Sequence, residues 1–169
     1  FVDCTEAVIG DTAAYREHIR YGVDHWRTRI ESSLGPFVTG LEGMAMGDAN
    51  GDGLDDIYLC QGSALPNRLF LQQTDGTACE VATEAGVDWL DPSNSALFID
   101  FDNDGDQDLA VGTNGSVLIH ENRGSAQFGV VAELPFDTQV ESMAAADYDN
   151  DGKVDLYVCG HTPQGEGHQ

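Results

Sequence analysis

Three copies of one acidic pattern, Asp-x-[Asp/Asn]-x-Asp-Gly-x-x-Asp, are the part of this chain with the clearest chemistry. The copies occupy residues 48–56, 100–108 and 147–155, so their first residues lie 52 and 47 positions apart. A hard divalent cation prefers several oxygen ligands, and a tight turn supplies them from side chains and backbone. We predict side-chain ligands at positions 1, 3, 5 and 9 of each loop and a backbone carbonyl ligand at position 7. The predicted ligands are Asp48, Asn50, Asp52, Leu54 and Asp56 in the first loop, Asp100, Asp102, Asp104, Asp106 and Asp108 in the second, and Asp147, Asp149, Asp151, Lys153 and Asp155 in the third.

Calcium is the cation that these loops suit best. Its coordination shell is larger and less demanding than that of magnesium, which favours ligands from a flexible turn. Glycine at position 6 permits the positive φ of a sharp turn. A solvated acidic turn is the alternative, but three copies with the same spacing favour three calcium sites. An EF-hand is excluded, because its twelfth position needs a glutamate and holds Leu59, Val111 or Val158 here.

The residues around the loops predict an all-β fold. Short apolar runs follow each loop, at 57–59, 109–111 and 156–158, and further runs typical of strands occupy 68–72, 79–82, 117–120 and 128–132. Residues 74–76 and 122–124 end in glycine and predict hairpin turns. A repeat of about 50 residues with four short strands is typical of a four-stranded antiparallel β-propeller blade. We predict a partial propeller with an N-terminal segment (1–36), two blades (37–90 and 91–139) and a partial third blade (140–169).

Residues 1–36 differ in pattern from the rest of the chain. Apolar residues from Tyr15 to Ile30 recur at helical spacing, and Asp11 stands where an N-cap would lie. Gly22 interrupts this run and lowers its helical propensity. Four of the seven basic residues lie in this segment: Arg16, Arg20, Arg27 and Arg29. They favour an amphipathic helix packed on the chain's own acidic domain over a cationic arm that contacts an acidic partner.

The loops and their strands resemble the FG-GAP or VCBS-type calcium-binding β-propeller repeats, above all those of the ASPIC/UnbV and cartilage-acidic-protein-like group. Motifs of that group stand at residues 67–70 (Asn-Arg-Leu-Phe), 75–77 (Asp-Gly-Thr) and 83–87 (Thr-Glu-Ala-Gly-Val). Gln72 and Ala78 replace the asparagine and phenylalanine of the group's pattern, and the second repeat is looser. Residues 1–5 resemble the group's outer-strand signature. The resemblance covers about residues 37–161 and implies calcium-bound blades, while the functions of the family are diverse.

The composition excludes several classes of partner. The chain of 169 residues has 30 acidic and 7 basic side chains and a net charge of −23. This excess of acidic side chains argues against binding to nucleic-acid phosphates or to an anionic membrane surface, both of which require lysines and arginines. No apolar run approaches the roughly 18 residues of a transmembrane helix, so no membrane insertion is expected. The first residue is Phe1 and not methionine, which predicts a processed product or an excerpt of a longer protein.

The four cysteines give no metal-binding or redox motif. Cys4, Cys60, Cys79 and Cys159 form no CxxC pair, which disfavours zinc and thioredoxin-type chemistry. Their even number leaves both a disulfide and free buried thiols open. Cys60 and Cys159 occupy matching positions in blades that are not neighbours, so we expect small buried residues there and no disulfide between them.

No catalytic constellation is evident, and a non-enzymatic role is the main expectation. The histidines form neither HExxH nor a triad: His18, His25, His120, His161 and His168. Two functions stay open. The first is a calcium-stabilised module for extracellular or periplasmic binding, adhesion or scaffolding, with a protein or glycan ligand. The second is the non-catalytic or substrate-shaping propeller part of a larger secreted enzyme, such as one that acts on polysaccharide. Fewer than three blades cannot close a ring, so the remainder of the propeller, in the same or another chain, is an expected partner.

Overall fold

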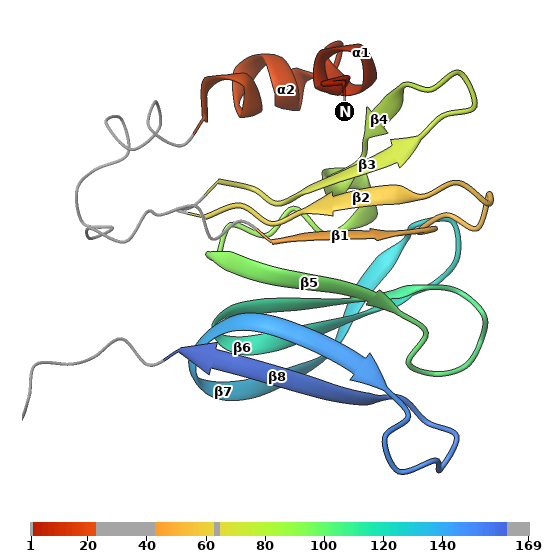
Figure 1. Ribbon diagram of the computed structural model, residues 1–169, viewed down its shortest axis with the longest axis vertical. Coiled ribbons are helices and arrows are strands. Elements are labelled where there is room, and N and C mark those ends of the chain that lie inside the picture. The colour runs from red at the N-terminus through yellow and green to blue at the C-terminus, as the bar shows by residue number, and fades with distance from the viewer. Residues whose placement is uncertain (1, 23–42, 63–64, 162–169) are drawn as a thin grey trace, which may run out of the picture.

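The computed structural model describes residues 2–22, 43–62 and 65–161. In these residues the chain forms two four-stranded antiparallel sheets beside a short helical segment (Figure 1), which confirms the predicted all-β, propeller-like class. The first sheet contains β1 (Met44–Gly47), β2 (Asp56–Leu59), β3 (Arg68–Gln72) and β4 (Ala78–Glu80). The second sheet contains β5 (Ser93–Ile99), β6 (Asp108–Asn122), β7 (Phe128–Ala146) and β8 (Asp155–His161). No helix in the described residues is long and apolar enough to cross a membrane.

The first sheet has the strand order of a single propeller blade, because its strands follow one another in space as they do in the chain. β1 pairs with β2 from Met44↔Leu59 to Gly47↔Asp56, and the first acidic loop joins them. Burial alternates along both strands, with Ala45 and Tyr58 on the buried face. Side chains of a strand point to opposite faces in turn, so this alternation identifies the face that packs against the second sheet.

The second sheet differs from the prediction in how its strands are joined. The runs at 109–111 and 117–120 lie in one strand, β6, and the run at 128–132 lies in β7 together with the strand that precedes the third loop. An irregularity at Gly115, whose φ is +123°, bends β6 without ending it. The sheet curls, so that β7 contacts β5 although the two are not neighbours. The boundary predicted between residues 139 and 140 therefore falls inside β7.

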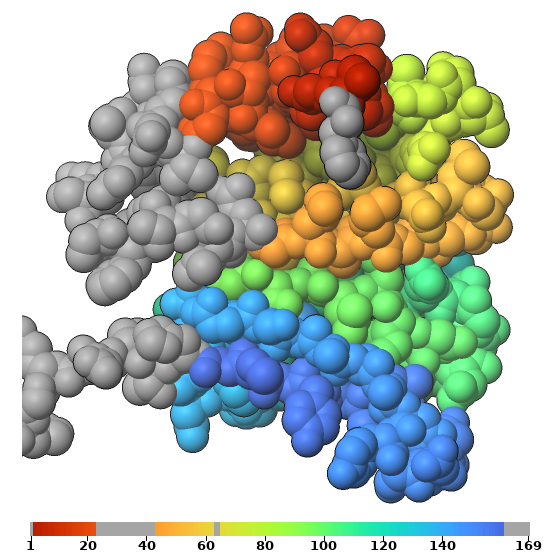
Figure 2. All heavy atoms as spheres, viewed as in Figure 1, coloured from red at the N-terminus to blue at the C-terminus, as the bar shows by residue number. Residues whose placement is uncertain are grey.

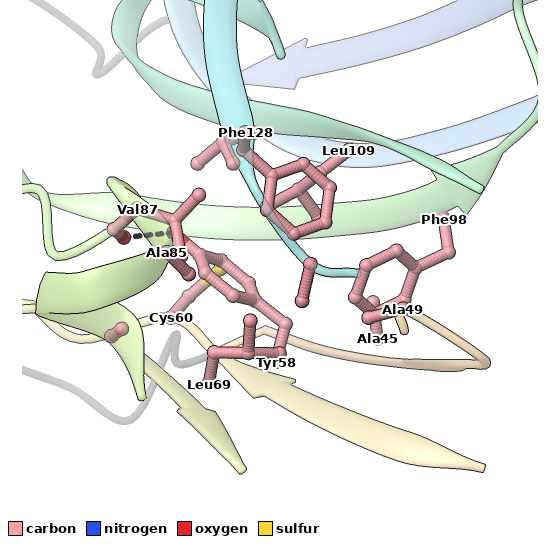
Figure 3. Packing of buried hydrophobic residues seen from close by; sticks show 13 residues of the cluster. Ala45, Ala49, Tyr58, Cys60, Leu69, Ala85, Val87, Phe98, Leu109 and Phe128 are labelled. Atoms are coloured by element: carbon pink, nitrogen blue, oxygen red, sulfur yellow. Dashed lines mark hydrogen bonds between the residues drawn. The ribbon is translucent and has the colours of Figure 1, made fainter. Parts of the chain in front are cut away.

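The main hydrophobic core lies between the two sheets (Figure 3). Tyr58 and Leu69 from the first sheet meet Leu109 and the Phe98–Phe128 pair from the second, and the two phenylalanine centroids are 6.5 Å apart. Burial of one such side chain contributes roughly 1.5–3 kcal/mol. This face-to-face packing of two sheets is what neighbouring blades of a propeller require.

A second cluster fills the inside of the curled sheet. It gathers Ala110, Val117, Ile119 and Val140, with partly buried residues of β8 such as Leu156 packed against them. Gly112 makes the close approach of β6 and β7 possible, because a Cβ at this position would lie 2.4 Å from Cγ1 of Val140. The second sheet thus has one apolar face toward the first sheet and another toward the strands around the third loop.

The connection after β4 is helical where we predicted strand. β4 ends at Glu80, and α4 (Ala82–Ala85) follows it, so the predicted strand at 79–82 is wrong at its end. Gly86 terminates α4 in the left-handed conformation, and Val87 donates its N–H to the carbonyl of Ala82. The turn predicted at residues 74–76 is confirmed, with Gly76 at φ +87°.

The N-terminal segment is helical, but its elements are shorter than predicted. It contains α1 (Thr5–Ile9), α2 (Ala13–Glu17) and the 3-10 turn η1 (Ile19–Tyr21). Gly22 has φ +67° and ends this run, so the predicted helix does not continue through it. The part of the prediction that falls on residues 23–36 lies outside the described residues. Residues 2–5 do not form the outer strand predicted there: Asp3 accepts the N–H of Thr5, and α1 begins at Thr5.

Thr12, and not Asp11, caps α2, because its Oγ accepts the N–H of Tyr15 at 3.2 Å. The segment packs beside β3 and β4 (Figures 1 and 2). Arg68 of β3 connects the N-terminal segment to the first sheet. Its guanidinium pairs with Glu80 of β4 at 3.5 Å and shares a hydrogen bond with Nδ1 of His18 in the segment. A buried β-strand residue therefore fixes the segment to the first sheet.

Candidate metal centre

Each acidic loop joins two adjacent antiparallel strands. The first loop (residues 48–56) connects β1 and β2, the second (100–108) connects β5 and β6, and the third (147–155) connects β7 and β8. All three lie along the same side of the molecule (Figure 1). The strand pairs thus present the three loops in equivalent positions.

The first loop wraps around the carboxylate of Asp48. Its two oxygens accept the backbone N–H groups of Gly51, Asp52 and Gly53 at 2.8–3.0 Å. Oδ1 of Asn50 accepts the N–H of Asp52 at 3.0 Å. These bonds point the loop's backbone donors at its own side chains, so that the loop is a compact turn before any ligand binds.

The other two loops repeat this geometry. Asp100 accepts the N–H groups of Asp104 and Gly105, and Asp147 accepts those of Asp151 and Gly152, at 3.0–3.2 Å. Position 6 is glycine with positive φ in all three loops, as predicted. Position 4 also has positive φ, at Gly51, Asn103 and Asn150. The sequence analysis missed this second requirement, although glycine and asparagine at matching positions were a signal for it.

Carboxylate oxygens converge in the second and third loops. One oxygen from each of Asp100, Asp102 and Asp108 lies within 4.8 Å of the others, and the same holds for Asp147, Asp149 and Asp151. The first loop has an amide, Asn50, at position 3. All of these donors are hard oxygens, a set that fits calcium and offers no thiolate or imidazole to a softer metal.

The aspartate at position 9 has a structural task beside its predicted ligand role. Asp56 is buried, and its two oxygens accept the N–H of Ala49 at 2.9 Å and of Gln72 at 2.8 Å. Burial raises the pKa of this carboxyl, although the two backbone hydrogen bonds oppose the shift and Asp52 and Asp48 reinforce it. Asp56 thereby closes the loop and joins it to β3, a role that spacing alone did not predict.

The same role recurs in the second loop and weakens in the third. Asp108 accepts the N–H groups of Phe101 and Asn122, and burial again raises its pKa. Asp155 accepts the N–H of Tyr148 at 2.9 Å and is exposed. The third loop is thus built like the others but less enclosed.

Among the described residues, no cysteine or histidine belongs to a group that could hold a metal ion. Cys60 is buried as expected, but Cys159 is exposed, so the expectation of a buried residue there is wrong. The described residues contain no disulfide among Cys4, Cys79 and Cys159, all of which are exposed. His120 is buried with its ring 5.7 Å from that of Trp89, and it is not a member of either carboxylate cluster.

Comparison with known proteins agrees with this architecture. The profile of the FG-GAP-like repeat family matches residues 48–111 and 100–158, which contain all three loops. Cartilage acidic protein 1 of Xenopus tropicalis is 30% identical over 126 residues, which are 70% of this chain and 19% of that protein. The mouse protein of that name is 30% identical over 136 residues, 75% of this chain and 20% of its own length. The human protein matches at 30% over 128 residues, 70% of this chain and 19% of its length.

The chain thus spans about a fifth of the length of these relatives. The family profile, in contrast, extends over most of the described strands. The chain belongs to the FG-GAP-like repeat family and is related to cartilage acidic protein 1.

Proposed function

We propose that this chain is a calcium-stabilised propeller module for extracellular or periplasmic binding, adhesion or scaffolding. The observation that carries the proposal is the set of three loops with one geometry, each with hard oxygen donors and each placed between two strands. The buried carboxylates at position 9 of the first two loops, Asp56 and Asp108, link those loops to the sheets. Calcium in the loops would therefore stabilise the blades themselves.

The energetic argument follows from ligand linkage. Without a cation, several carboxylates lie close together and repel one another. A ligand that binds only the folded state stabilises it by RT ln(1 + [L]/Kd), roughly 2.7 kcal/mol per site at a hundredfold excess over Kd. Calcium sites of extracellular modules bind with Kd values of about 0.1–1 mM, so sites of this kind are mostly occupied wherever the free calcium concentration exceeds these values.

The test is thermal unfolding in calcium and in excess chelator. We expect a marked fall in melting temperature on chelation and recovery when calcium is restored. Asp52→Ala, Asp104→Ala and Asp151→Ala should each remove part of this calcium dependence. Asp137→Ala, which changes an exposed aspartate outside the loops, is the matched control and should leave it intact. A melting curve that chelator does not change would overturn the proposal.

The exposed face of the third repeat supports a role within a larger propeller. Tyr148 and Tyr157 are exposed there, with ring centroids 6.4 Å apart. The residue that matches Tyr157 in the first repeat, Tyr58, is completely buried against the second sheet. We propose that further blades, in the same or another chain, cover Tyr157 in the same way, and that the assembled propeller offers a face to a protein or glycan ligand.

A further inference from the structure

Asn122, the last residue of β6, lies between two acidic loops. Its backbone N–H donates to Oδ1 of Asp108, the position 9 aspartate of the second loop, at 2.8 Å. Its side-chain Nδ2 donates to the carbonyl of Gln107 in the same loop at 2.9 Å and to the carbonyl of Ala49 in the first loop at 2.8 Å. Asn122 is 2% exposed, and its bonds to Asp108 and Ala49 are buried. One buried side chain thus holds the backbones of two loops from different sheets.

The first loop meets this bridge through Ala49, which is also buried. Its carbonyl accepts a second hydrogen bond from the N–H of Ala126 at 3.1 Å. Its own N–H donates to Asp56, the position 9 aspartate of the first loop. A continuous set of hydrogen bonds therefore runs from Asp56 through Ala49 and Asn122 to Asp108.

We infer that Asn122 couples calcium binding at the first and second loops, so that occupation of one loop raises the affinity of the other. The inference rests on the proposed function, since it requires calcium in both loops. Each loop is already a compact turn, and a bound cation restricts the motion that its side chains and backbone retain. The Asn122 bridge transmits this restriction to the neighbouring loop, so the second cation binds with a smaller loss of conformational entropy, which is positive cooperativity. Asn122 is a positioning residue and not a ligand.

The chain contains two internal comparisons. Gln72 occupies the place of Asn122 in the first repeat, because its backbone N–H donates to Asp56 as that of Asn122 donates to Asp108. Among the described residues, the Gln72 side chain forms no hydrogen bond to a second loop. In the same part of the chain, no hydrogen bond joins the second loop to the third. Within the described ranges, the bridge therefore joins the first pair of loops alone.

The experiment is a double-mutant cycle read by calcium titration calorimetry on the 169-residue chain. Asp149→Ala with Asp151→Ala removes the third site from the background. The affinity of the first loop is then measured with the second loop intact and with Asp104→Ala. We expect the loss of the second site to weaken the first by about fivefold or more, the range of measured couplings. The ratio of the two first-loop affinities, with and without the second site, should fall close to one in Asn122→Ala. Gln72→Ala should leave this ratio unchanged.

A second measurement keeps the inference testable if Asn122→Ala does not fold. With Asn122 unchanged, the coupling of the first and second loops is compared with that of the second and third, using Asp52→Ala, Asp104→Ala and Asp151→Ala. The bridged pair should show the larger coupling. Equal coupling in both pairs, or coupling that survives in folded Asn122→Ala, would overturn the inference and leave the proposed function standing. If none of the three loops binds calcium, both the inference and the proposed function are overturned.

Discussion

The first and third repeats have the same motif after their loops and bury it differently. Residues 56–60 read Asp-Ile-Tyr-Leu-Cys and residues 155–159 read Asp-Leu-Tyr-Val-Cys. Tyr58 is 0% exposed and Tyr157 is 65% exposed. Cys60 is buried and Cys159 is exposed. The sequence of a repeat therefore does not by itself decide whether its tyrosine lies in a core.

The second repeat shows what determines whether the residue at this position is buried. Leu109 packs in the core between the sheets, while Ala110, the next residue, packs in the cluster toward β8. Ala110 stands where Tyr58 and Tyr157 stand in their repeats. The residue at this position thus faces the following strands, and Tyr58 and Ala110 are buried because those strands are present. Local sequence determines the direction of the side chain, and the neighbouring sheet determines its burial.

The largest expected difference is between Tyr58→Ala and Tyr157→Ala. Tyr58→Ala removes a fully buried ring and its hydrogen bond to the carbonyl of Val87, which measures 3.0 Å. We expect it to lower the free energy of unfolding by about 3–5 kcal/mol. Tyr157→Ala removes an exposed ring and should cost less than about 0.5 kcal/mol. Urea unfolding of the 169-residue chain in saturating calcium measures both values.

Two further measurements sharpen this first comparison. Tyr58→Phe keeps the ring and leaves the Val87 carbonyl without its partner, so it should cost about 1–2 kcal/mol. In a longer protein in which another blade covers β8, the cost of Tyr157→Ala should rise toward that of Tyr58→Ala. Equal costs for the two alanine variants in the 169-residue chain would contradict the distinction between the faces.

We expect a smaller difference in the free energy of unfolding between Asp56→Ala and Asp155→Ala. Both are measured in excess chelator, so that no bound cation contributes. Asp56→Ala leaves the N–H groups of Ala49 and Gln72 without their acceptor. Each buried donor left unpaired costs about 1–3 kcal/mol, and relief of repulsion from nearby carboxylates offsets part of this, so we expect a net loss of about 2–4 kcal/mol. Asp155→Ala frees the N–H of Tyr148 at the surface, where water replaces the carboxylate. A loss for Asp155→Ala as large as that for Asp56→Ala would show that burial is not the cause.

Much of the fold was predictable because the loops repeat. Their spacing and the apolar runs after them identified the strand that follows every loop, and β3 begins and ends where the pattern placed it. The glycine at position 6 was equally predictable, since a sharp turn needs a positive φ there. The ligand positions of the three loops, and calcium as their cation, stay predictions.

Other features depend on contacts that a local pattern does not contain. The fusion of two predicted strands into β6 depends on the packing of the curled sheet, because Gly115 bends the strand without ending it. The second role of Asp56 requires the N–H of Gln72, sixteen residues away. Residues 1–5 matched an outer-strand signature, but a local hydrogen bond from Thr5 to Asp3 favours a helix start there.

The smallest expected effect on the free energy of unfolding comes from His120, which is buried. Burial lowers the pKa of this imidazole below its ordinary value, although interactions with the backbone of Leu109 and Leu118 oppose the shift. Its Nδ1 lies 3.3 Å from the carbonyl oxygen of Leu109, and its Nε2 has no hydrogen-bond partner in the described residues. A second proton would therefore place a charge in the core with nothing to accept its hydrogen bond.

The sign of the pH dependence follows from linkage. The unfolded histidine titrates near pH 6.5 and the folded one at lower pH, so the unfolded state takes up the proton first as the pH falls. The stability due to neutral His120 is thus complete above about pH 6.5 and is lost as the pH falls toward the folded pKa. Because a single proton is taken up, the free energy of unfolding changes by at most about 1.4 kcal/mol per pH unit. Urea unfolding from pH 7.5 to 5.5 in saturating calcium should show a shallower slope in His120→Gln than in the parent chain. Burial and the charge of Arg68 also lower the pKa of His18, so both chains should be compared with His18→Asn added. Identical slopes in that background would mean that His120 is solvated in the folded protein and that the core between the sheets is more open than the structure shows.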